Sequence, residues 1–217
     1  MTPFLALKKL LEQNADEKAA GQMSAYMRDQ FKYYGIPTPK RRALSKSFLG
    51  KKSDPLDWEF VNACWNADRR EMQYVAMDYL YRRTEQLTRV DIPKIRQLAE
   101  AKSWWDTIDG LDQLVGDIAL RDKSVKQILL KWSKDQNFWI RRMAIDHQLN
   151  YREKTDTGLL AAAIKNNFDR TEFFINKAIG WALREYSKTN PYWVREFLDS
   201  NGAYMAPLSI REASKYV

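Results

Sequence analysis

The chain has 217 residues, and 36 Lys and Arg against 28 Asp and Glu give it a formal charge of +8 at neutral pH. The single cysteine, Cys64, excludes an intramolecular disulfide and a cysteine-rich zinc site. Without a run of about 18 apolar residues or a signal-peptide pattern at the N-terminus, the sequence predicts a soluble protein of a reducing compartment.

Helical periodicity extends over almost the whole chain. Eight Gly and seven Pro are few for this length, and no alternating strand pattern is present. From the N-terminus, the predicted helices cover 3–13, 16–33, 39–49, 56–66, 69–87, 92–101, 104–120, 123–134, 138–151, 157–166, 171–188, 191–199 and 209–217. Helix-start signals are Thr38-Pro39 and Asn190-Pro191, with capping boxes at Ser103–Asp106 and Ser209–Glu212.

One apolar motif recurs with a fixed period. The motif is a small residue followed by an aliphatic one, with a further apolar residue four positions after the aliphatic residue. It starts at Ala76, Gly110, Ala144 and Ala178, so successive copies are 34 residues apart. A fixed period that carries two helices is typical of an α-solenoid. The predicted fold is therefore all-α: one domain, 1–217, of HEAT-like helix pairs that is curved with a basic concave face.

The predicted helix 104–120 places Trp105, Asp109, Asp112 and Gly116 on an arc beside its apolar stripe, whereas Trp104 lies on the flank of that stripe. The spacing of four residues brings the indole of Trp105 next to the carboxylate of Asp109. Trp105 and Asp109 are candidate site residues. In the alternative, Trp105 packs on the next repeat and Asp109 is a solvated helix charge.

In the predicted helix 171–188, Lys177, Trp181, Arg184 and Lys188 align on a face away from the apolar stripe. An aromatic ring among cations suits a surface that binds a polyanion and stacks on part of it. The alternative is cation–π packing between repeats.

Further cations have specific positions. Arg142 lies in the apolar stripe of 138–151 and needs a partner, either a phosphate or a carboxylate of the next repeat. Lys40, Arg41 and Arg42 follow a predicted helix start, where phosphate oxygens bind, although such runs are often solvated faces. His147 and Cys64 are interpreted as structural, and the sequence predicts no metal site.

These residues lie in segments that resemble the AlkD family of DNA alkylation repair glycosylases. The segments are Met23–Met27, Gly35–Arg42, Lys102–Asp109, Phe138–Arg142, Ala178–Tyr186 and Pro207–Ala213, and the resemblance covers essentially the whole chain. It implies a HEAT-like solenoid that releases cationic N-alkylated purines, chiefly 7-methylguanine and 3-methyladenine, from duplex DNA without a metal or another cofactor. Family members often continue beyond the position of Val217.

By position, the resemblance makes Asp109 the catalytic carboxylate and places Trp105, Trp181 and Arg142 around it. The adjacent Arg141 is an alternative to Arg142. Tyr26 matches a further aromatic of the cleft. The full set of expected DNA-binding residues is Tyr26, Lys40, Arg41, Arg42, Arg141, Lys177, Arg184 and Lys188.

The expected activity is that of a monofunctional glycosylase that acts as a monomer on double-stranded DNA containing alkylated purines. Its expected location is the cytoplasm, at the bacterial nucleoid when it is bound to DNA, and no membrane is involved. Two other classes stay open. One is a non-catalytic DNA-binding solenoid of the same family, and the other is a helical-repeat scaffold for protein partners.

Overall fold

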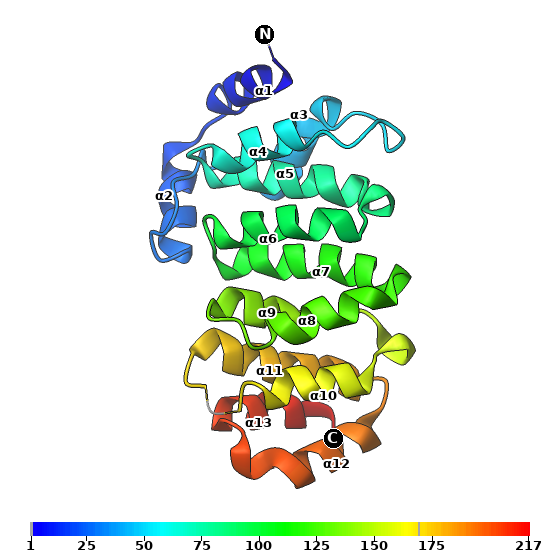
Figure 1. The fold of residues 1–217 in the computed structure, drawn as a ribbon. Coiled ribbons are helices and arrows are strands. Elements are labelled where there is room, and N and C mark those ends of the chain that lie inside the picture. Colours follow the sequence, from blue (N-terminus) through cyan, green and yellow to red (C-terminus); the bar gives the residue numbers. More distant parts are fainter. Residues whose placement is uncertain (1, 169) are drawn as a thin grey trace. The chain divides into compact units, whose positions relative to one another are not determined.

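The computed structural model describes residues 2–168 and 170–217. This part of the chain is helical, without strands, and the all-α repeat prediction is confirmed. Internal contacts divide the chain into two compact units, Met1–Gln86 and Leu87–Val217. The helices of both units are drawn in Figure 1. The single-domain expectation stays a prediction. No helix in the described ranges has the length and apolar character to cross a membrane.

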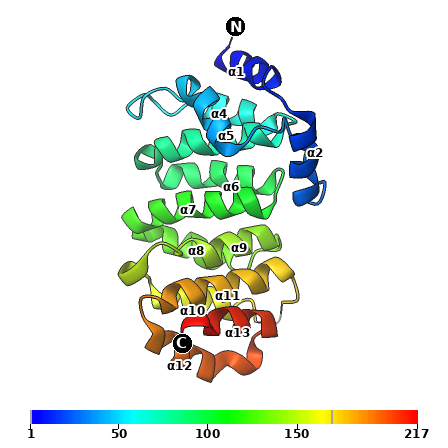
Figure 2. The same cartoon turned by 180° about the vertical axis from the view of Figure 1, so that it is seen from behind.

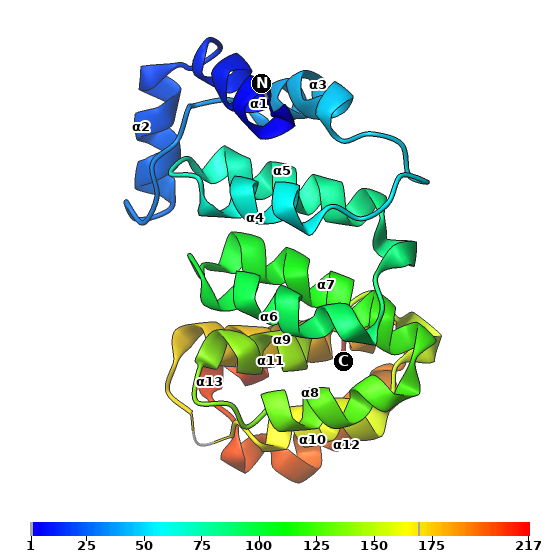
Figure 3. The same ribbon diagram turned by 45° about the horizontal axis from the view of Figure 1, so that its top comes forward.

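The first unit contains five α-helices, of which α4 and α5 run side by side (Figure 3). The helices are α1 (Pro3–Glu12), α2 (Glu17–Tyr26), α3 (Thr38–Ser45), α4 (Trp58–Asn66) and α5 (Arg70–Arg82), with short 3₁₀ turns at Lys46–Phe48 and Thr84–Gln86. The predicted helix 16–33 is wrong beyond Tyr26. Arg28 and Asp29 both have φ of +55°, a left-handed conformation that ends a helix.

The loop after α2 is held by a distant carboxylate. Glu71, buried on α5, accepts hydrogen bonds from the backbone N–H groups of Tyr34, Gly35 and Ile36 at 2.8–3.2 Å. Gly35 has φ of +84°, and a Cβ there would lie 2.1 Å from the carbonyl oxygen of Asp16. Long-range contacts, rather than local helix propensity, therefore set the path of this segment.

The second unit is a stack of helix pairs, in which α7, α9, α11 and α13 pack in succession (Figures 1 and 2). Its helices are α6 (Ile92–Glu100), α7 (Trp105–Arg121), α8 (Lys126–Trp132), α9 (Phe138–Asp146), α10 (Thr157–Lys165), α11 (Phe173–Ser187), α12 (Pro191–Asn201) and α13 (Pro207–Ala213). The 3₁₀ turns are Arg89–Asp91, Lys123–Val125, Arg152–Lys154, Gly202–Tyr204 and Ser214–Tyr216. Gly110, Ala144 and Ala178 are buried at corresponding places in α7, α9 and α11, as the 34-residue period predicts.

The helix-start signals had mixed outcomes. Asn190 caps α12 by accepting a hydrogen bond from the N–H of Trp193, as predicted. Thr38 is the first residue of α3 and makes no capping hydrogen bond. The capping boxes at Ser103 and Ser209 are also wrong, because these hydroxyls donate to carbonyl oxygens of α6 and α11. At Ser209 a contact with another helix replaces the local cap, whereas the hydroxyl of Ser103 turns back to the end of the preceding helix.

A glycine brings α7 and α9 into close contact next to the candidate site. A Cβ on Gly116 would lie 2.2 Å from the carbonyl oxygen of His147, so no larger residue fits without moving a backbone. The hydroxyl of Tyr151 donates a short hydrogen bond to the carbonyl oxygen of Gly116. This close approach holds the two helices whose side chains form the site.

Candidate active site

Asp109 on α7 and Arg142 on α9 form a two-point ion pair between neighbouring repeats. Nε and Nη2 of Arg142 donate to the two carboxylate oxygens of Asp109 at 2.7 and 2.9 Å. Nη1 donates to the carbonyl oxygen of Phe174 on α11 at 2.7 Å. The side chain of Arg142 is 3% exposed, and that of Asp109 is 19% exposed. Arg142 therefore joins three helices, while one edge of Asp109 stays accessible.

This geometry bears on the two partners that the sequence leaves open for Arg142. The structure pairs the guanidinium with a carboxylate of the neighbouring repeat, and all three of its nitrogens point at protein groups. Arg142 is thus placed to orient Asp109. Contact of Arg142 with a DNA phosphate stays a prediction.

Two more carboxylates lie beside this pair. Asp112 is one turn after Asp109 on α7, Asp146 is one turn after Arg142 on α9, and both are fully buried. Oxygen atoms of Asp109, Asp112 and Asp146 lie within 4.8 Å of one another. Nη2 of Arg142 is 3.5 Å from Oδ2 of Asp146. The guanidinium of Arg142 therefore supplies the positive charge next to these carboxylates. Asp112 lies on the same helix arc as Asp109 in the sequence-based prediction, without a predicted role, and Asp146 was not predicted.

The environment shifts the pKa of each of these groups. Burial raises the pKa of Asp109, and the hydrogen bonds from Arg142 oppose that rise. Burial also raises the pKa of Asp146, to about 7, against the attraction of Arg142. The pKa of Asp112 lies well above its ordinary value because of burial and of the neighbouring Asp146. Burial lowers the pKa of Arg142, but Asp146 and Asp109 raise it more, so the guanidinium stays charged.

Two partly exposed tryptophans adjoin the ion pair. Trp181 on α11 is half-buried, and its ring centroid is 6.0 Å from Cζ of Arg142. Trp105 is the first residue of α7, four positions before Asp109, and it is also half-buried. Trp104 instead packs against Trp139 and Phe174, with ring centroids 5.8 and 5.4 Å apart. Trp104, which the sequence places on the flank of the apolar stripe, thus packs among aromatic rings although it is also half-buried.

The predicted basic face of α11 is formed, but its cations have acidic partners. Nζ of Lys177 and Nη1 of Arg184 lie 3.0 and 2.6 Å from the carboxylate of Glu212 on α13. Hydrogen bonds from Lys215 and Lys177 lower the pKa of Glu212 to about 2. Lys188 binds Glu185 at 2.7 Å. Of this face, Lys177 and Lys188 keep substantial exposure, with 39% and 49% of their side chains accessible.

Arg141, the sequence-based alternative to Arg142, points elsewhere. Its side chain is 4% exposed and forms a short ion pair with Glu172, and Nη1 donates to the carbonyl oxygen of Asp135 at 2.8 Å. The hydrogen bonds of Arg141 go to Asp135, Gln136 and Glu172, so the structure favours Arg142 as the partner of the Asp109 carboxylate.

The expected DNA-binding residues of the first unit differ in exposure. Tyr26 is 73% exposed, and Lys40 and Arg42 are also exposed. Arg41 is 5% exposed, donates to Asp78 at 2.9 Å and lies over the ring of Tyr74. Arg42 donates to the same carboxylate at 3.3 Å, but its side chain is 64% exposed. Tyr26, Lys40 and Arg42 therefore face solvent, whereas Arg41 is enclosed within its unit.

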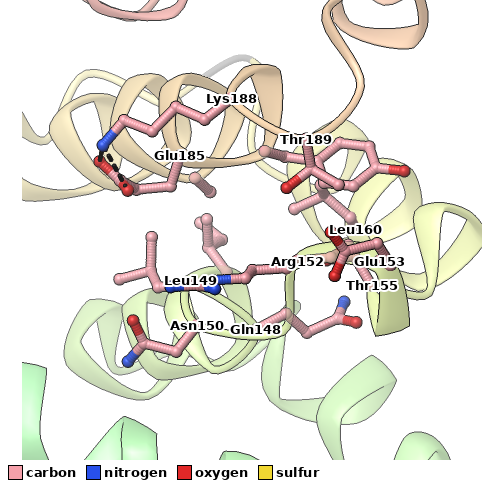
Figure 4. Close-up of a pocket in the computed structure, with 13 residues that line it drawn as sticks. Gln148, Leu149, Asn150, Arg152, Glu153, Thr155, Leu160, Glu185, Lys188 and Thr189 are labelled. Atoms are coloured by element: carbon pink, nitrogen blue, oxygen red, sulfur yellow. Dashed lines mark hydrogen bonds and ion pairs between the residues drawn. The ribbon is translucent and has the colours of Figure 1, made fainter.

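A polar cavity of about 420 Å³ in the second unit lies apart from this ion pair (Figure 4). Its lining includes Gln148, Arg152, Glu185, Lys188 and Thr189, from the ends of α9 and α11 and the loop after α9. Asp109, Arg142 and Trp181 do not line it. Among the predicted site residues, only Lys188 borders the cavity, so it is not the candidate active site.

His147 and Cys64 are buried, as their structural interpretation predicts. Nδ1 of His147 is 2.9 Å from the carbonyl oxygen of Ala144, and burial lowers its pKa to about 4, so the imidazole is neutral near pH 7. Burial raises the pKa of Cys64 to about 12, which keeps the thiol protonated.

Comparison with known proteins connects this geometry to DNA repair. Residues 7–217 match the sequence model of a family described as DNA alkylation repair enzyme. The chain is also similar to the solved structure of a predicted DNA alkylation repair enzyme from Enterococcus faecalis, with 36% identity and a TM-score of 0.87 over 94% of this chain and 96% of that chain. The search of curated proteins gave no match.

Proposed function

Because the chain belongs to the family of DNA alkylation repair enzymes, we propose that it is a DNA glycosylase for cationic N-alkylated purines, such as 7-methylguanine and 3-methyladenine, in duplex DNA. The observation that carries this proposal is Asp109: a partly exposed carboxylate, fixed at both oxygens by a buried arginine and adjoined by two half-buried tryptophans. A non-catalytic DNA-binding protein of the same family is the alternative.

The chemistry needs few groups from the protein. A purine alkylated at a ring nitrogen already carries a positive charge, so it leaves as a neutral base without a general acid. As the bond between C1′ and the base nitrogen breaks, positive charge develops on the deoxyribose. The carboxylate of Asp109 stabilises that charge, most effectively where water is excluded. Water then adds to C1′ and releases one proton, which Asp109 can accept.

The tryptophans and exposed cations have supporting parts in the proposal. Trp105 and Trp181 place their rings against the sugar and backbone of the damaged nucleotide and attract its positive charge. Tyr26, Lys40 and Arg42 in the first unit, and Lys177 and Lys188 in the second, contact the DNA backbone. With no side-chain amine assigned as a nucleophile, the product is an abasic site in an intact strand.

The decisive test is release of free 7-methylguanine from a methylated duplex by the wild type and by Asp109→Asn. The wild type is expected to release the base, and Asp109→Asn to lower the rate by about 10²–10³-fold with similar affinity for the duplex. Asp117→Asn, an exposed carboxylate on the same helix, is the matched control and should keep the wild-type rate. Binding without release by the wild type would favour the non-catalytic alternative.

A further inference from the structure

The guanidinium of Arg142 serves two carboxylates rather than one. It binds Asp109 at 2.7 and 2.9 Å and lies 3.5 Å from Oδ2 of Asp146, one helical turn away on α9. Both oxygens of Asp146 are buried and accept no hydrogen bond within the described chain. The charge state of Asp146 therefore depends on Arg142, and Asp146 competes with Asp109 for the same cation.

The surroundings of Asp146 leave it few other influences. The charged groups that act on it are Arg142 on its own helix and Asp109 on α7. Asp112, also on α7, lies within the same cluster, and α11 contributes the carbonyl of Phe174, which is occupied by Arg142. The neighbouring His147 is turned toward Ala144 and is neutral.

The pKa of both buried carboxylates is raised. The pKa of Asp146 is raised to about 7, and that of Asp112, whose two oxygens accept no hydrogen bond within the described chain, lies well above its ordinary value because of burial and of the neighbouring Asp146. Counting Asp109, Arg142 and Asp146, the cluster carries no net charge when Asp146 holds a proton and a net charge of −1 when it does not. Around pH 7, one proton thus changes the charge beside Asp109.

We propose that Asp146 is a positioning residue of this glycosylase: when it is ionised it takes a share of the positive charge of Arg142, which leaves more of the negative charge of Asp109 for the substrate. The inference rests on the proposed function. When Asp146 is protonated, Arg142 neutralises Asp109 alone. A cationic nucleotide at the exposed edge of Asp109 is then attracted less, and its transition state is stabilised less, in surroundings of low dielectric constant.

The test is a pH profile of 7-methylguanine release under single-turnover conditions with excess protein, between pH 5.5 and 8.5, corrected for release without protein. The wild-type rate is expected to rise about fivefold from pH 6 to pH 8, because a group with a pKa near 7 loses its proton over this range and the ionised form is about tenfold faster. Asp146→Asn mimics the protonated state. It should give a rate near that of the wild type at pH 6, with little change across this range.

Asp112→Asn is the matched control, because it also replaces a buried carboxyl of the cluster by an amide. Since neither oxygen of Asp112 accepts a hydrogen bond within the described chain, and Nη2 of Arg142 lies next to Asp146 instead, this variant should keep the rise in rate with pH. A second readout separates positioning from structural support. Asp146→Asn removes a buried charge, so its Tm at pH 8 should be equal to or above that of the wild type even though its rate is lower.

Two results would overturn the inference while the proposed function stands. In one, Asp146→Asn keeps the rate and pH profile of the wild type. In the other, it lowers the rate and the Tm together and leaves the pH profile unchanged, which is the behaviour of a residue that only supports the fold. Absence of release by the wild type at every pH would refute the glycosylase proposal, and the role of Asp146 with it.

Discussion

Replacing Arg142 by Met tests how much of the stability of the second unit depends on one guanidinium. The substitution replaces the apolar stem of the side chain but leaves Asp109 with no cation, removes the ion pair of Asp146 and leaves the carbonyl of Phe174 without its donor. Because Arg142 is 3% exposed, water does not replace these contacts. Removing one partner of a buried ion pair costs about 3–5 kcal/mol. At about 2–4 °C per kcal/mol, the Tm should fall by about 6–20 °C.

Urea unfolding followed by tryptophan fluorescence measures this loss, with Arg184→Met as the control. Arg184 also pairs with a carboxylate, but its side chain is 23% exposed and Glu212 keeps Lys177 and Lys215, so its removal should cost less than about 1 kcal/mol. The loss of stability in Arg142→Met should be smaller at pH 5 than at pH 7.5. At pH 5, protonation of Asp109 and Asp146, which have lost their cation, costs less free energy. A loss below about 1 kcal/mol at pH 7.5 would contradict the reasoning.

Four further predictions concern packing, charge and binding. Gly116→Ala should destabilise the fold by about 1–3 kcal/mol, because its Cβ meets a backbone oxygen of α9, whereas Gly21→Ala, with open space around it, should be neutral or stabilising in thermal melts. Between about pH 4 and pH 7, Asp146 holds its proton in the folded state but not in the unfolded chain, so the stability of the wild type should fall as the pH rises and the stability of Asp146→Asn relative to it should grow, as urea titrations would show. Cys64 should react with a thiol reagent only after unfolding, which a colorimetric thiol assay follows. Duplex affinity should fall steeply from about 50 to 200 mM salt in a titration, and a flat response would count against DNA binding.

The sequence predicts the helices well because each buries a stripe with helical period. Ile108, Leu111 and Leu114 are fully buried on α7, as their spacing indicates. The helix and capping predictions are wrong where a contact with a distant residue, rather than the local sequence, determines the backbone path or the partner of a side chain. The end of α2 depends on the loop that Glu71 holds, and the hydroxyl of Ser209 serves a neighbouring helix. The residues that adjoin these positions in the sequence do not indicate such distant partners.

The candidate site was predictable in its components but not in its electrostatics. The resemblance gave Asp109 and Arg142 their roles, but the residue patterns alone left a phosphate and a carboxylate as equal partners for the arginine. Asp146 was not predicted because the sequence alone does not distinguish a buried carboxyl group from a solvent-exposed polar side chain. One signal was present: Asp112 and Asp146 are one 34-residue repeat apart, and Asp109 and Arg142 are 33 apart, so the period itself brings these residues together.

The contact of Arg142 with both α7 and α11 has a consequence for local opening. In a repeat protein, each repeat contacts only its neighbours, so terminal repeats can unfold while the rest stays ordered. Here a single side chain on α9 bonds to the repeats on both sides of it and so connects three consecutive repeats. Opening of α7 or α11 away from α9 would break it, so amides of the three helices should exchange with solvent as one cooperative group. The carboxylate of Asp109 is then held in place only while all three repeats are stacked.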